Sequence, residues 1–130
     1  MQNDTNHNMK NALKSTGGLQ RISRALGYSI AGLKAAYEHE FAIKQEVFLA
    51  VFFVPLGFYL GQTNIERIML VGAVLVVFIA ELLNSAIEAA IDHTSLDLHP
   101  LAGRAKDIGS AAVLVTLVLF ALVWLLILFG

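Results

Sequence analysis

Three long apolar stretches dominate the pattern of hydrophobic and polar positions along the chain. Residues 47–65 and 108–130 carry no charged side chain, and a third stretch at 68–80 continues its hydrophobic pattern past two glutamates to residue 91. About 20 apolar residues cross a bilayer as a helix, and helices satisfy their backbone hydrogen bonds internally. The pattern therefore predicts an all-α integral membrane protein with three transmembrane helices, at about 42–61, 65–92 and 101–129.

The segment before these stretches has a different periodicity. At 100° per residue, one face carries Leu19, Ile22, Leu26, Ile30, Leu33 and Tyr37, and the opposite face carries Arg21, Arg24 and Tyr28. This pattern is typical of an amphipathic helix that lies in the membrane interface. We expect this interfacial helix at about 17–38, after a disordered polar tail at 1–14. The polar start holds no apolar run, so we expect no signal peptide there.

Composition supports a membrane protein and excludes several chemistries. Of the 130 residues, 57% are hydrophobic and 15% are charged, against about 45–50% and about 25% in soluble domains. We therefore treat residues 15–130 as a single membrane domain. The net charge of −1 gives no general attraction to nucleic acid. The absence of cysteine excludes disulfides, thiolate nucleophiles and cysteine metal sites.

The positive charges predict the orientation. Most of the nine Lys and Arg residues precede the first span, Arg104 and Lys106 flank the second loop, and Arg67 alone is in the first loop. The positive-inside rule then places the N-terminus and the second loop in the cytoplasm. Tyr59 and Trp124, near the outer ends of two spans, are expected as interface anchors.

One face of the second span carries a row of polar residues, here called the acidic stripe. Its members are spaced i, i+3, i+4, i+7 and i+11, which places them on one side of a helix. Ionisable groups at membrane depth are costly and suggest function. A packing interface between helices is the alternative, above all for the uncharged members. The acidic stripe consists of Glu81, Asn84, Ser85, Glu88 and Asp92.

Two glutamates on one helix face repel each other unless a cation or a proton lies between them. Carboxylates suit Mg²⁺ together with phosphate oxygens, but the spacing alone leaves Mg²⁺, Na⁺ and a proton open. Outside the stripe, Glu40 is expected to pair with Lys44 at i+4. Arg104 and Lys106 suit either interface anchoring or a polyphosphate.

At this point the residues match a known family. The pattern E-x-x-N-S-A-x-E-x-x-x-D at 81–92, followed by Gly-Arg-Ala-Lys-Asp-Ile-Gly-Ser at 103–110, closely resembles the prokaryotic diacylglycerol kinases. The resemblance covers roughly 19–129. It implies a homotrimeric bundle in the bacterial inner membrane that transfers the γ-phosphate of ATP to the hydroxyl of diacylglycerol.

The resemblance also implies roles for individual residues. Glu81 would be the general base, with Asn84 supporting the site, and Glu40 and Glu88 would hold Mg²⁺. The lipid substrate would meet Arg21, Glu81 and Ser110. The nucleotide-binding residues would be Arg21, Tyr28, Glu40, Glu88, Asp97, Leu98, His99, Lys106 and Asp107.

Three alternatives stay open at this stage. The loop at 97–102 is more similar to a sister branch that phosphorylates undecaprenol. A non-catalytic membrane assembly protein would use the acidic stripe to join helices. A small cation channel would be lined by Glu81 and Glu88, although the nearby basic residues favour a polyphosphate.

Overall fold

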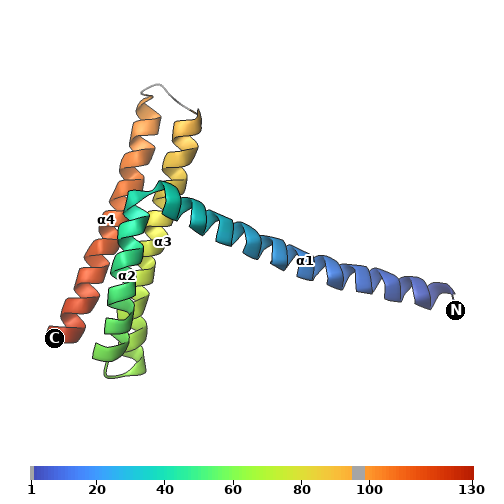
Figure 1. Cartoon of the computed structure of the whole chain (residues 1–130), viewed down its shortest axis with the longest axis horizontal. Helices are drawn as coiled ribbons and strands as arrows, with labels where there is room; N and C mark the ends of the chain where they lie inside the picture. Colours follow the sequence, from blue (N-terminus) through green and yellow to red (C-terminus); the bar gives the residue numbers. More distant parts are fainter. Residues whose placement is uncertain (1, 95–98) are drawn as a thin grey trace. The chain divides into compact units, whose positions relative to one another are not determined.

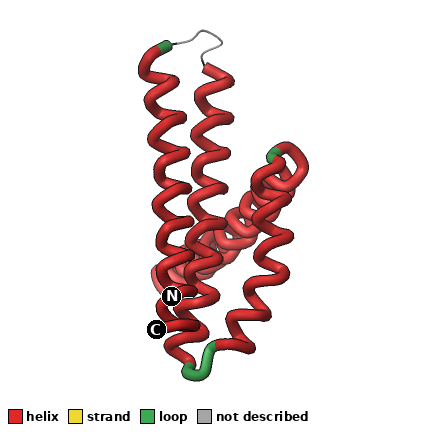
Figure 2. The backbone as a smooth tube through the Cα atoms, turned by 90° about the vertical axis from the view of Figure 1, so that its left-hand side faces the viewer, coloured by secondary structure: helices red, strands yellow, loops and turns green. Residues whose placement is uncertain are grey.

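The computed structural model describes residues 2–94 and 99–130, with side chains from residue 17 onward. The described residues form four helices and no strand (Figure 1, Figure 2). The all-α prediction is confirmed, and each predicted span begins and ends within two residues of a helix. The helices are α1 (Gln2–His39), α2 (Phe41–Leu60), α3 (Asn64–Thr94) and α4 (Pro100–Phe129).

Helix α1 carries the apolar face expected of an interfacial helix. The helix begins at Gln2, so residues 2–14 of the tail expected to be disordered at 1–14 are helical. Residues 9–14, Met-Lys-Asn-Ala-Leu-Lys, are mostly good helix formers, which favours this continuation. Its large apolar side chains are exposed, among them Leu19, Ile22, Leu26, Ile30 and Leu33.

The turn between α2 and α3 is held by side-chain hydrogen bonds. Thr63 Oγ1 accepts from the Glu66 N–H at 3.1 Å, and Glu66 Oε2 accepts from the Thr63 N–H at 3.3 Å. This reciprocal pair is a capping box, which satisfies free N–H groups at the start of a helix. Arg67 Nε donates to the Phe58 carbonyl at 3.1 Å, near the end of α2. A side chain at Gly61 would collide with the Arg67 backbone, so the turn requires glycine there.

Helix α3 packs against both α2 and α4. Gly57 lets α2 approach α3 and α4 closely, because a Cβ at this position would lie 3.2 Å from Leu70 Cβ and 3.6 Å from the Trp124 ring. Trp124 is buried in the core and donates its Nε1–H to the Leu70 carbonyl at 3.1 Å. The Phe53 ring meets it edge-on at 5.1 Å. The expectation of Trp124 as an interface anchor was therefore wrong, because its N–H finds a backbone partner inside the bundle.

We expect Trp124→Phe to destabilise the bundle by about 1 kcal/mol, the net contribution of one buried hydrogen bond. Trp124→Ala also removes the ring and should cost about 3–5 kcal/mol. Unfolding in mixed detergent micelles, followed by circular dichroism, measures both changes. Leu125→Ala is the matched control because Leu125 is 57% exposed on the same helix. A Trp124→Ala effect no larger than that of the control would contradict this core.

The end of the bundle that holds the acidic stripe extends past α2. At 1.5 Å per residue, α2 is about 30 Å long, whereas α3 and α4 are about 45 Å long. The C-terminal part of α3 and the N-terminal part of α4 therefore continue beyond the first turn of α2 (Figure 1). All three helices are long and apolar enough to cross a membrane, and most of their large apolar side chains are exposed. The protein is an integral membrane protein.

Candidate active site

The acidic stripe begins level with the start of α2. Glu81 lies about 26 Å along α3 from its first residue, close to the length of α2. It is half-buried and lines an open groove of about 440 Å³ together with the first two turns of α2. Glu88 and Asp92 follow on the extension of α3 beyond that level. The stripe therefore runs from the level of the first turns of α2 along the extension of α3.

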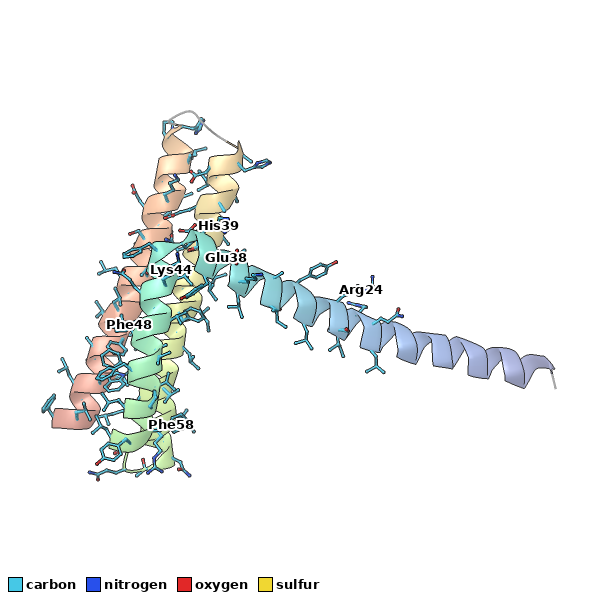
Figure 3. The ribbon with its side chains drawn as sticks, viewed as in Figure 1. Arg24, Glu38, His39, Lys44, Phe48 and Phe58 are labelled. Atoms are coloured by element: carbon cyan, nitrogen blue, oxygen red, sulfur yellow. The ribbon has the colours of Figure 1, made fainter. Side chains whose placement is uncertain are left out.

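The groove beside Glu81 has both an apolar and a polar lining. Its apolar members include Phe41, Phe48 and Leu49, and its polar members include Lys44 and Glu46. Figure 3 shows Lys44 and Phe48 on the first half of α2. Such a groove suits an amphipathic molecule whose polar end meets the Glu81 carboxylate and whose apolar body lies along α2.

Glu40 lies between α1 and α2, outside helical geometry, with φ −113° and ψ 115°. Its side chain makes no capping hydrogen bond to α2. Lys44, its expected partner, lies with Nζ 5.9 Å from the centre of the Tyr37 ring. The charges of Glu40 and Glu88 both act on Glu81. Three carboxylates thus share one electrostatic neighbourhood, which a cation would stabilise.

Asn84 contacts Glu88 and lies against Gly109. Its Nδ2 donates to Glu88 Oε1 at 3.1 Å. Its Oδ1 is buried and has no hydrogen-bond partner within the part of the chain that the structure describes. A methyl group at Gly109 would collide with this Oδ1 atom. Asn84, expected to support the site near Glu81, therefore orients the carboxylate of Glu88.

We expect Gly109→Ala to lower by about tenfold any activity that depends on the Glu88 carboxylate, because residues that orient a functional carboxylate at a metal site typically contribute 10–100-fold. The added methyl group displaces Asn84 and releases Glu88. Gly103→Ala is the matched control on α4, since a methyl group there meets no atom within 4 Å. Both changes favour the helix equally, so initial rates with saturating substrates isolate the steric effect. Equal activity of the two variants would contradict it.

The side chain of Lys106, on the neighbouring helix α4, contacts the acidic stripe. Lys106 Nζ, on α4, lies 2.6 Å from Asp92 Oδ1 on α3. Asp107 and Ser110, on the same helix, are exposed. His99 is the N-cap of α4, and its Nδ1 accepts from the Leu101 N–H at 3.1 Å.

Four expected site residues have no described position relative to the stripe. Arg21 and Tyr28 are exposed on α1, a part of the chain that is described by itself. Asp97 and Leu98 lie outside the described residues. Their assignment to the nucleotide, and that of Arg21 to the lipid, stays a prediction.

Glu46 is a candidate that the sequence analysis missed. It lines the groove together with Glu81. It also borders a cavity of about 50 Å³ among Phe53, Val77 and Phe120, inside the three-helix bundle. The sequence could have indicated Glu46, because it is an ionisable residue inside the first predicted span. The same property singled out Glu81 and Glu88 in the second span.

The donor set suits a divalent cation that is completed by its substrate. Within residues 17–94 and 99–130, whose side chains are described, no three His, Asp or Glu side chains are close enough to hold a metal ion by themselves. Glu40 and Glu88 supply oxygen donors only. Mg²⁺ is usually bound by one or two carboxylates plus phosphates and water, rather than by an all-protein cage. The oxygen donors present therefore fit the protein's usual share of a divalent cation bound together with phosphates.

Comparison with known proteins identifies the family. The sequence profile of the family described as prokaryotic diacylglycerol kinase matches residues 27–128. A diacylglycerol kinase of Haemophilus influenzae is 46% identical over 109 residues, covering 84% of this chain and 92% of the relative. Those of Pseudomonas aeruginosa and Escherichia coli are 46% and 42% identical over 117 and 116 residues, covering 90% and 89% of this chain and 95% of each relative. The chain belongs to the prokaryotic diacylglycerol kinase family.

Proposed function

We propose that this protein transfers the γ-phosphate of ATP to the free hydroxyl of diacylglycerol, which gives phosphatidic acid and ADP. Family membership supports a lipid kinase. The groove between Glu81 and the first turns of α2 carries the proposal, because it offers apolar side chains for the lipid and a carboxylate for its hydroxyl. No soluble kinase motif is needed, since phosphoryl transfer depends mainly on positioning and charge neutralisation.

In the proposed reaction, Glu81 takes the proton of the lipid hydroxyl. The alcohol oxygen forms a bond to the γ-phosphorus while the bond from that phosphorus to the β,γ-bridging oxygen breaks, and ADP leaves. The apolar lining at Phe41 and Phe48 holds the lipid so that its hydroxyl meets the carboxylate at the groove. Positioning and proton removal of this kind each contribute orders of magnitude to the rate.

Glu40 and Glu88 are the proposed ligands of Mg²⁺. The ion would neutralise the charge of the ATP phosphates. Asn84 keeps the Glu88 carboxylate in place through its Nδ2–H. Lys106 supplies a positive charge on the same side, from α4. On the family resemblance, the remaining nucleotide contacts are Arg21, Tyr28, Asp97, Leu98, His99 and Asp107.

We further propose a homotrimer in the bacterial inner membrane, with the N-terminus and the acidic end of α3 in the cytoplasm. The concentration of Lys and Arg before α2 supports this orientation. The family resemblance supports the trimer. The mass of the detergent-solubilised protein, determined by light scattering, checks the oligomeric state, and a mass of one or two chains would contradict it.

The lipid substrate is tested by offering diacylglycerol and undecaprenol side by side. Purified protein in mixed micelles with labelled ATP and Mg²⁺ should label diacylglycerol at the higher kcat/KM. Faster labelling of undecaprenol would replace the proposed substrate. Labelling of neither lipid would contradict the proposed kinase activity.

A further inference from the structure

Asp92 is the one charged member of the acidic stripe to which the proposed reaction gives no task. Its carboxylate contacts the Lys106 ammonium, with Oδ1 and Nζ 2.6 Å apart. The contact joins α3 to α4 on the extension of both helices beyond α2. The Asp92 side chain is 63% exposed and the Lys106 side chain is 42% exposed.

This ion pair contributes little to holding the bundle together. Exposed ion pairs typically contribute little to stability, because solvent screens them and ordering two side chains costs entropy. The two helices are already joined by a buried core, including Trp124 and its hydrogen bond to Leu70. The consequence of the pair is therefore local: it restricts a long lysine side chain that would otherwise sample many rotamers.

The pair also fixes where the lysine charge lies relative to the proposed metal ligand. Asp92 follows Glu88 by four residues, so their side chains are neighbours on one face of α3, about 6 Å apart. Lys106 accordingly interacts with the charge of Glu88 as well as that of Asp92. An ammonium group has three N–H donors, and the contact with Asp92 leaves two of them for other acceptors.

We propose that Asp92 is a positioning residue for the nucleotide. Its carboxylate holds the Lys106 ammonium beside Glu88, so that the remaining N–H groups meet the phosphates of ATP. This inference rests on the proposed kinase function. It predicts that removing the Asp92 charge weakens ATP binding. A carboxylate that merely added negative charge near the phosphates would repel ATP, and its removal would strengthen binding.

Asp92→Asn keeps the shape of the side chain and removes the charge that orients Lys106. We expect the KM for MgATP, and the dissociation constant measured by calorimetry, to rise about three- to tenfold. The KM for diacylglycerol and the helix content should stay unchanged. Asp92→Glu, which keeps the charge, should recover most of the affinity for ATP.

A double-mutant cycle separates positioning from any other effect. In the Lys106→Met background, Asp92→Asn should have no further effect on ATP affinity, since there is no ammonium left to orient. An unchanged or tighter affinity in Asp92→Asn would overturn the inference, and so would the same weakening in both backgrounds. Because calorimetry measures ATP binding without turnover, absence of kinase activity in the wild-type protein contradicts the proposed function separately. A wild-type protein that binds no ATP overturns both.

Discussion

Glu81→Gln is expected to lower kcat by about 10²–10⁴-fold, the usual contribution of a general base. The amide has the shape of the carboxylate but cannot accept the proton of the lipid hydroxyl. Glu81 is half-buried beside the groove on α2, where the proposed lipid hydroxyl meets its carboxylate. The measurement is the initial rate of phosphate transfer from labelled ATP to diacylglycerol in mixed micelles.

Glu66→Gln is the matched control for this substitution. Glu66 is on the same helix, in the first turn of α3, where its Oε2 accepts from the N–H groups of Gln62 and Thr63 in the turn before the helix. Glutamine serves in a capping box as well as glutamate does, so this variant should keep the wild-type rate. ATP binding by Glu81→Gln should also be retained. Activity within threefold of wild type in Glu81→Gln would remove Glu81 from the role of base.

Glu88→Gln is expected to raise the Mg²⁺ concentration needed for half-maximal rate by about 10–100-fold. One of the two proposed carboxylate ligands is lost, while an amide oxygen still offers an acceptor to Asn84 Nδ2. Excess Mg²⁺ should therefore restore part of the rate. A titration of rate against free Mg²⁺ at saturating ATP measures the shift.

Comparing the two glutamates separates a metal ligand from a base. Glu81→Gln should lose rate at every Mg²⁺ concentration, with an unchanged half-maximal point. Glu88→Gln should raise the Mg²⁺ concentration needed for half-maximal rate. An unchanged Mg²⁺ requirement in Glu88→Gln would show that the ion is held elsewhere, and the neighbouring carboxylate Glu46 on α2 would then be the first residue to test.

The three spans could be predicted closely because each one has a local signal. Apolar stretches of membrane-spanning length and the Gly-containing turn at 61–64 placed α2, α3 and α4 within two residues. Trp124 was misplaced for a physical reason. A tryptophan near the end of a span suits either the interface or the core, and its partner, the Leu70 carbonyl, is 54 residues away in the sequence.

The candidate site was predictable as a row of residues but not as a set of contacts. Asn84 is three residues after Glu81 and four before Glu88, and both spacings allow a side-chain hydrogen bond on a helix. Only the structure shows that Glu88 is the acceptor. The constraint that Gly109 places on Asn84 comes from a different helix and has no signal in the local sequence.

For Glu40, the local spacing suggested a partner that the structure does not show. Its spacing to Lys44 suggested a surface ion pair, and only the resemblance to the kinase family gave it a role. In the structure, Lys44 lies over the Tyr37 ring, and the Glu40 charge acts on Glu81. Glu40 lies at the break between α1 and α2, and the backbone geometry of this break decides which side chains it can meet. The i, i+4 rule assumes a continuous helix and does not include that geometry.

The most direct test of the account compares wild type and Glu81→Gln in one experiment. Each purified protein receives diacylglycerol, Mg²⁺ and ATP labelled at the γ-phosphate, and the lipid product is separated and counted. We predict labelled phosphatidic acid from the wild-type protein and at least about 100-fold less from Glu81→Gln, with equal ATP binding by both. Equal labelling by the two proteins, or none by the wild type, would contradict the claim that Glu81 is the base of a diacylglycerol kinase.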